Sequence, residues 1–317
     1  MRQAGRYMAE YRAVRERYGF LELCKTPDAA AEVTVTAVER LGVDAAIIFA
    51  DILLVLEPMG ARVEFTKGDG PVIHDPVRST TAVDRLREAD MGALGYVAEA
   101  VRRARAALRV PLIGFAGAPF TLASYLVEGG SSHQHTRTRA FMMADPGAWH
   151  ALLAKLARAV AAYANLQIAA GAEAVQLFDS WVGCLQPADY REYVLPHMRT
   201  LIAGITPGVP VIHFGTGTSG LLEAMRAAGG SVLGVDWRVD LDTAWARVGH
   251  DVAIQGNLDP AALLAPIPEI RRRAAAILGQ AAGRPGHIFN LGHGIFPETP
   301  VDHVRALVDA VHELSAR

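Results

Sequence analysis

The sequence predicts an α/β fold in which parallel strands form a sheet that is covered by helices. Short apolar runs, typical of strands buried on both faces, alternate with longer stretches of helical periodicity. No linker or low-complexity segment interrupts this alternation, which favours one domain over residues 1–317. We expect seven buried strands, so the architecture is either a (β/α)8 TIM barrel with one strand unidentified or an open doubly wound sheet.

The expected elements begin with a short helix over residues 8–18. A second helix has Thr26 as N-cap and Pro27 at its first position, and it stops at Gly42. Residues 62–65 and 72–74 are typical of a β-hairpin excursion. The seven buried strands are expected at residues 45–50, 111–115, 174–178, 210–214, 231–235, 252–254 and 287–291. The later helices are expected at about 92–108, from 119, at about 146–170, from 187, from about 219, from 241, at 260–282 and from 300 to the end.

The composition is that of an ordinary globular protein, with 51% hydrophobic and 20% charged residues. A net charge of −2 argues against a nucleic-acid-binding surface. The only two cysteines, Cys24 and Cys184, provide neither a disulfide framework nor the spacing of a metal site. A reduced, cytoplasmic compartment fits this cysteine content. We find no signal peptide and no apolar run of transmembrane length, and we expect a protein that binds no membrane.

The most unusual stretch is the first strand, where Asp51 interrupts a long apolar run. A carboxylate among apolar groups either has a partner that needs its charge or takes up a proton. The structural alternative is an Asp that caps the short helix after the strand. This stretch alone favours the alternative slightly.

Polar residues follow nearly every expected strand. They are Asp51, Asp179, Ser180, Gly215, Asp236, Gln255, Asn257, Gly292 and His293. In a barrel these residues would converge on the rim that carries the chemistry, whereas an open sheet would concentrate its site at one crevice.

Three of the rim and helix residues differ in how strongly they suggest a site. His293 lies between two glycines after the last strand, where a core histidine is rare, so a site role is favoured. Ser180 has no Gly-X-Ser-X-Gly motif around it and is expected to be a hydrogen-bonding hydroxyl rather than a nucleophile. Tyr125 lies on an apolar helix, where a core position and a site position are about equally expected.

Two further motifs point less strongly to a functional site. Arg2 and Arg6 are four residues apart and could clamp carboxylates, although terminal arginines are usually solvated. The glycine-rich stretch 214–220 could cradle a phosphate, but it lacks the P-loop lysine, so a turn with Ser219 as N-cap is preferred. For His213 we favour a role other than metal binding, because no further ligands lie nearby in the sequence.

With these residues in view, the sequence closely resembles the uroporphyrinogen decarboxylase family over essentially its whole length. The matching stretches are 1–7 (MRQAGRY), 49–53 (FADIL), 114–121 (GFAGAPFT), 178–181 (FDSW), 255–260 (QGNLDP) and 290–294 (NLGHG). The resemblance implies a (β/α)8 barrel with N-terminal helices, a cytoplasmic homodimer and a carboxy-lyase that needs no cofactor and no metal. The implied reaction, in haem biosynthesis, removes CO2 from the four acetate side chains of uroporphyrinogen to give coproporphyrinogen.

The resemblance also implies the site residues. Asp51, Arg2 and Arg6 are expected to be catalytic. The expected substrate contacts are Arg2, Gln3, Ala4, Gly5, Arg6, Phe20, Asp51, Tyr125, Ser180 and His293. Members of the family normally have residues before the position of Met1, so we expect this chain to be truncated there.

Two other functions compete with this one. A zinc-dependent corrinoid methyltransferase shares the superfamily, but it would need a zinc–thiolate site that the two scattered cysteines do not favour. A non-catalytic tetrapyrrole-binding protein would not need a charged Asp51.

Overall fold

The computed structural model describes residues 3–66 and 70–316 of the chain. Within them, seven parallel strands form one sheet in the order β1-β4-β5-β6-β7-β8-β9. The strands are β1 (Ala46–Ile47), β4 (Leu112–Gly117), β5 (Ala174–Asp179), β6 (Val211–Gly215), β7 (Val232–Gly234), β8 (Ala253–Leu258) and β9 (His287–Leu291). The expected seven strands are therefore confirmed. Their order follows the sequence, as in a TIM barrel, and lacks the reversal of a doubly wound sheet.

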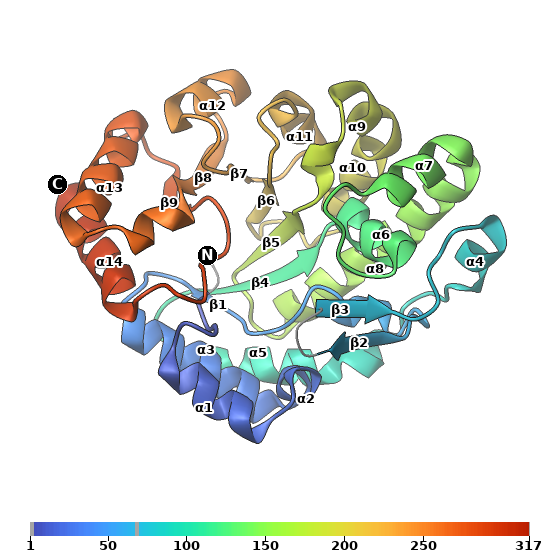
Figure 1. Cartoon of the computed structure of the whole chain (residues 1–317), viewed down its shortest axis with the longest axis horizontal. Helices are drawn as coiled ribbons and strands as arrows, with labels where there is room; N and C mark the ends of the chain where they lie inside the picture. Colours follow the sequence, from blue (N-terminus) through green and yellow to red (C-terminus); the bar gives the residue numbers. More distant parts are fainter. Residues whose placement is uncertain (1–2, 67–69, 317) are drawn as a thin grey trace.

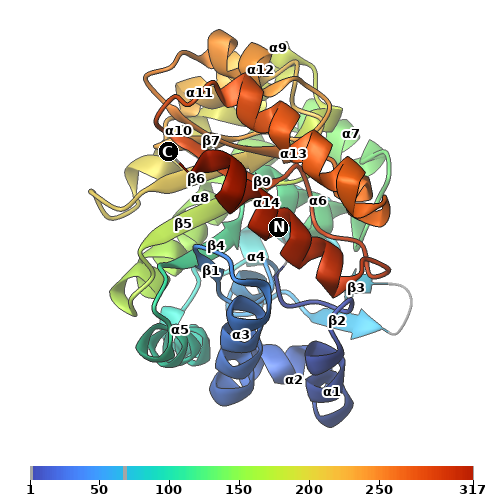
Figure 2. The same cartoon turned by 90° about the vertical axis from the view of Figure 1, so that its left-hand side faces the viewer.

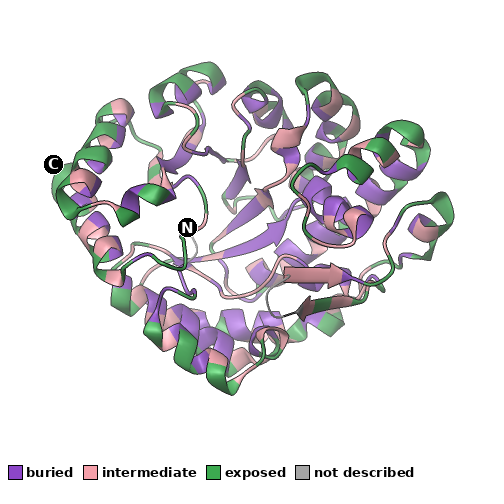
Figure 3. Cartoon of the chain, viewed as in Figure 1, coloured by how far each residue is buried: buried purple, intermediate pink, exposed green. Residues whose placement is uncertain are grey.

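The sheet is curled, with its strands in the middle and its helices around them (Figure 1). The long helices are α3 (Pro27–Leu41), α5 (Gly95–Ala107), α8 (Pro146–Ala169), α13 (Ile267–Ala281) and α14 (Val301–Ser315). The shorter ones are α1 (Ala9–Arg17), α2 (Phe20–Lys25), α4 (Thr80–Arg85), α6 (Pro119–Glu128), α7 (Thr136–Ala144), α9 (Pro187–Tyr193), α10 (Leu195–Ala203), α11 (Leu222–Ala228) and α12 (Leu241–Val248). Buried residues face the strands and exposed residues face outward (Figure 3).

Two side-chain amides take the place of neighbouring strands at the short strand β1. The Gln3 amide donates to the Ala45 carbonyl at 2.7 Å and accepts from the Ile47 N–H at 2.8 Å. On the other side, β1 ends before it can pair with Phe115 of β4. The buried Gln167 amide accepts from Phe115 N–H at 2.9 Å and donates to its carbonyl at 2.8 Å. These bonds satisfy backbone groups that would otherwise be buried without partners.

The expected hairpin is present as β2 (Val63–Thr66) and β3 (Gly70–Ile73). A single bridge joins Val72 to Gly130, which connects the hairpin to the segment between α6 and α7. In the view turned by 90°, the hairpin and α7 lie toward one side of the molecule and α5 toward the other (Figure 2). None of the helices in the described part of the chain is long and apolar enough to cross a membrane.

Prolines divide two helices that the sequence predicted as continuous. The expected helix at 260–282 is split into a 3-10 helix, η4 (Pro260–Leu264), and α13, with Pro266 between them. The helix expected from 187 breaks at Val194, two residues before Pro196, into α9 and α10. The helix expected at 92–108 begins as a 3-10 helix, η2 (Met91–Leu94), before α5. Helices α2, α4 and α7 were not predicted from the sequence.

Candidate active site at the C-terminal rim of the strands

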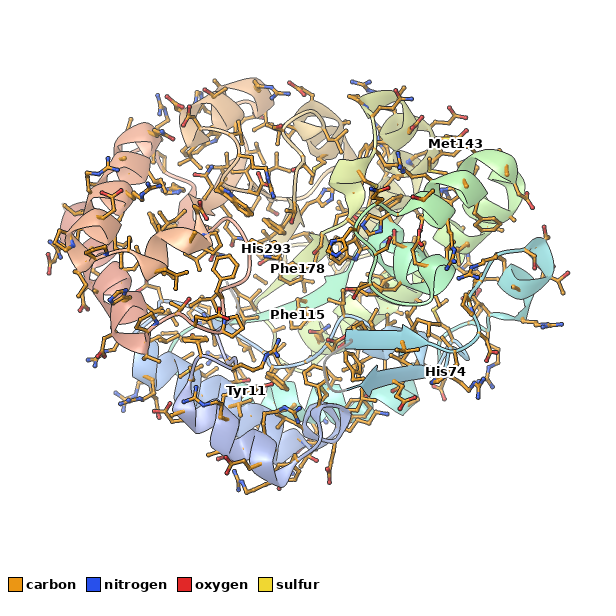
Figure 4. The ribbon with its side chains drawn as sticks, in the orientation of Figure 1. Tyr11, His74, Phe115, Met143, Phe178 and His293 are labelled. Atoms are coloured by element: carbon orange, nitrogen blue, oxygen red, sulfur yellow. The ribbon has the colours of Figure 1, made fainter. Side chains whose placement is uncertain are left out.

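The structure places three predicted site residues after the carboxyl ends of their strands. Asp51 lies four residues after β1, Ser180 directly after β5 and His293 two residues after β9. Because the strands are parallel, these ends share one edge of the sheet. His293 and Phe178 lie near the middle of the ring of elements (Figure 4). The rim is therefore where a substrate would meet all three residues.

The half-buried Asp51 has a local structural role as well as a charge. Its Oδ1 accepts a hydrogen bond from Leu53 N–H at 2.8 Å, just before the 3-10 helix η1 (Leu54–Leu56). The capping contact that the sequence offered as an alternative is thus real. The carboxylate also acts at longer range, because burial, and then the charge of Asp51, raises the pKa of the Cys24 thiol. A carboxylate has about four acceptor sites, so one in this position can both cap the turn and accept hydrogen bonds from other donors.

A row of aromatic rings crosses the sheet beside this rim. The rings of Phe115 and Phe178 are 5.5 Å apart, and those of Phe178 and Phe214 are 6.0 Å apart, both edge to face. They come from the neighbouring strands β4, β5 and β6. Phe178 is only partly buried, so the row offers an apolar surface to a partly apolar ligand.

Tyr125 lies against a tryptophan that follows Ser180. The rings of Tyr125, on α6, and Trp181 are 5.9 Å apart. The ring of His135 also packs on Trp181, with the ring centres 5.1 Å apart. Burial lowers the pKa of this histidine. The contact brings the predicted residues Tyr125 and Ser180 to the same part of the rim.

Some of the predicted N-terminal contact residues are buried in the fold, whereas Arg6 is exposed to solvent. Gln3 uses its amide on the β1 edge, as described above, and its carbonyl accepts from the Tyr7 hydroxyl at 2.6 Å. Ala4 and Gly5 are buried, whereas Arg6 is exposed. Arg2 lies outside the described residues. Of the predicted N-terminal contacts, Arg6 therefore presents a charged group to solvent.

Phe20 belongs to an aromatic cluster rather than to the rim strands. Its ring is 4.6 Å from that of Phe65 and 6.1 Å from that of Phe49. The Arg15 guanidinium lies 5.6 Å from the centre of the Phe20 ring. The structure thus joins α2 to the hairpin and to the segment that leads into Asp51.

The glycine-rich loop after β6 does not have the form of a phosphate cradle. The Gly217 N–H, which would face a phosphate, donates to the buried Asp236 carboxylate at 2.6 Å. Ser219 is not the N-cap that we expected, because α11 begins only at Leu222. The loop instead packs closely on Gly183, where an added Cβ would lie 2.1 Å from the Thr216 carbonyl oxygen.

His213 forms a buried pair with a carboxylate. Its Nε2 lies 3.9 Å from Asp179 Oδ2, and both side chains have no exposed surface. Over residues 3–66 and 70–316, no group of three or more His, Cys, Asp or Glu side chains could hold a metal ion.

Two tryptophans that contact predicted site residues were not predicted as part of the site. Trp181 packs on Tyr125, and the Trp237 ring lies 6.3 Å from that of His293. The available signal was position, since each lies two or three residues after the end of a strand, Trp181 after β5 and Trp237 after β7.

Comparisons with known proteins agree on one family. The family model described as uroporphyrinogen decarboxylase (URO-D) matches residues 1–314. A uroporphyrinogen decarboxylase of Sorangium cellulosum is 61% identical over 99% of this chain and 91% of that protein. One of Roseiflexus sp. is 57% identical over 100% of this chain and 93% of that protein.

A methyltransferase from Methanosarcina mazei has a similar structure, with a TM-score of 0.76 over 96% of this chain and 91% of that chain. Its sequence identity is 21%, so this likeness concerns the fold alone. The family model and the close relatives decide the assignment: the chain belongs to the uroporphyrinogen decarboxylase family.

Proposed function

We infer that the chain is a carboxy-lyase that decarboxylates the four acetate side chains of uroporphyrinogen III to give coproporphyrinogen III. The observation that carries this inference is the family match over residues 1–314. The same match does not favour the corrinoid methyltransferase or the non-catalytic tetrapyrrole-binding protein. The rim residues agree with the chemistry of such a substrate, a flexible macrocycle with eight carboxylates and four pyrrole N–H groups.

We assign to Asp51 the central role at the rim. A carboxylate can accept several N–H donors, so Asp51 can orient pyrrole N–H groups while it keeps its bond to Leu53. Loss of CO2 from a pyrrole acetate requires protonation of the ring, which places positive charge on it. A fixed carboxylate beside the ring stabilises that charge as it develops.

We propose that the arginines bind the periphery of the macrocycle. Arg6 is exposed and can form paired hydrogen bonds with a substrate carboxylate. Arg2 is assigned the same role on the family motif alone. A guanidinium holds its proton throughout the physiological pH range and is a poor proton donor, so binding is the role that we assign to both. Gln3, Ala4, Gly5, Phe20, Tyr125, Ser180 and His293 are proposed as further substrate contacts.

We also propose that residues 1–317 form one domain and that the enzyme is a cytoplasmic homodimer without a cofactor. The family resemblance supports the last three proposals, and one hydrophobic core that includes residues from Ala4 to Leu307 supports the first. Analytical ultracentrifugation tests the homodimer.

The activity is tested by an anaerobic assay with enzymatically prepared uroporphyrinogen, followed by chromatography of the oxidised products. We expect a series from eight to four carboxyl groups. Recovery of uroporphyrin alone, with folded protein, would contradict the function.

A further inference from the structure

The loop after β7, residues 236–239, is held in place by two other segments. The Asp236 carboxylate is 1% exposed and accepts hydrogen bonds from Gly217 N–H at 2.6 Å and Arg238 N–H at 3.1 Å. Asn257 of β8 donates its amide to the carbonyls of Asp236, at 3.0 Å, and Val239, at 2.6 Å. The loop is therefore preorganised by buried bonds, as is typical of loops that must hold a binding group in place.

This loop presents one cation at the rim. The Arg238 guanidinium carbon lies 4.1 Å from the centre of the Trp237 ring, and its Nη1 donates to Asp236. The Trp237 ring in turn meets the His293 ring edge to face. An added Cβ on Gly292 would lie 2.5 Å from Trp237 N, so the end of β9 packs directly on the loop. Guanidinium, indole and imidazole thus form a row on the rim.

The Arg238 guanidinium has N–H groups that can bind a ligand in addition to Asp236. A guanidinium has five N–H groups, and the side-chain bond to Asp236 uses Nη1 alone. Asp236 already accepts from two backbone N–H groups, and the Arg238 side chain remains 49% exposed. Stacking on Trp237 and the bond to Asp236 fix the plane of the guanidinium. A planar fork fixed in this way matches the geometry of a carboxylate.

We propose that Arg238 binds a peripheral carboxylate of the substrate, beside His293. This inference rests on the proposed function, which supplies a ligand with eight carboxylates. Arg6 lies three residues after Gln3, whose amide is bonded to the backbone at β1, and three strands separate β1 from β7 in the sheet order. The two arginines therefore bind carboxylates on different sides of the macrocycle. Four of the eight carboxylates are retained in the product, and we assign one of these to Arg238. Because a retained carboxylate does not react, Arg238 contributes to binding equally in the ground state and the transition state.

The test is the kinetics of Arg238→Gln with uroporphyrinogen under anaerobic conditions. We expect KM to rise about tenfold or more, as for a lost hydrogen bond to a charged group, with kcat within about twofold of wild type. The difference in KM between the wild type and Arg238→Gln should become smaller at high salt, which screens the attraction between Arg238 and the substrate carboxylate. Arg238→Lys keeps the charge but loses the planar fork, so its KM should lie between that of the wild type and that of Arg238→Gln. Arg226→Gln is the matched control, because it removes an arginine paired with Asp251 at 2.7 Å on the outer helix α11.

The outcomes separate this inference from the proposed function. An Arg238→Gln enzyme with wild-type KM, or one that loses only kcat, would overturn the role of Arg238 while the activity stands. If Arg238→Gln fails to fold, a wild-type KM in folded Arg238→Lys overturns the role, and a raised KM supports it. Absence of turnover in the wild type would instead overturn the proposed function.

Discussion

Replacing Asp51 by asparagine separates its charge from its structural contact. Asparagine keeps a carbonyl oxygen that can accept from Leu53 N–H, which Asp51 Oδ1 does now at 2.8 Å. The free energy of unfolding should therefore change by less than about 1 kcal/mol, since asparagine and aspartate are comparable caps. If the charge stabilises a cationic ring, turnover should fall on the order of 10²-fold or more, or about 2.7 kcal/mol in activation free energy.

Two other substitutions at this position sharpen the comparison. Asp51→Ala removes both the charge and the acceptor, so it should lose about 1 kcal/mol of stability in addition to the activity. Asp51→Glu keeps the charge but displaces it by about one methylene, and a misplacement of ~1 Å can cost ~10²-fold. We expect glutamate to be impaired, though less severely than asparagine.

The assay is the initial rate of uroporphyrinogen consumption without oxygen, together with urea unfolding monitored by circular dichroism. Asp90→Asn is a matched control, because Asp90 Oδ1 accepts from Gly92 N–H at 2.9 Å before another 3-10 helix, η2. This control should keep full turnover. Near wild-type turnover in Asp51→Asn would refute the electrostatic role, even though the family assignment would stand.

Three further predictions concern binding and stability. Arg6→Ala should raise KM with little effect on unfolding, because the side chain is exposed; equal KM values would refute the carboxylate clamp. Gln167→Leu should lower the free energy of unfolding by on the order of 3 kcal/mol, since it leaves two buried groups of Phe115 unpaired, and urea titration measures this. Burial, and then the neighbouring His150, lowers the pKa of His197 from its ordinary 6.5 to about 4. The unfolded chain binds this proton more tightly, so stability should fall as the pH drops from about 6.5 to about 4. His197→Gln should reduce that fall, and an unchanged pH dependence would contradict the assignment.

The sequence predicted the strands well because each is a short apolar run next to a polar residue. It predicted the rim residues for the same reason, since Asp51, Ser180 and His293 stand where apolar runs end. It could not predict that β1 would be so short, because the bonds that replace its neighbours come from Gln3 and Gln167. Glutamine gives no local sign that its amide will pair with a distant strand.

The contacts between site residues likewise join positions that are far apart in the sequence. Trp237 meets His293, and Asn257 holds the loop that carries Arg238, across separations of 56 and 18 or more residues. No periodicity in the sequence connects such positions. The breaks in the helices at Pro266 and Val194 could have been predicted from the sequence. Prolines disfavour a continuous helix at and just before their own position, and Val194 lies two residues before Pro196.

We expect Asp51 to face the pyrrole nitrogens of the bound macrocycle. A crystal structure of the enzyme with coproporphyrinogen, grown and frozen without oxygen, would show whether it does. We predict Asp51 carboxylate oxygens at about 2.7–3.2 Å from pyrrole nitrogens, with Arg6 and Arg238 on peripheral carboxylates. A macrocycle bound at the rim with Asp51 turned away from its nitrogens, or bound elsewhere on the protein, would contradict this expectation.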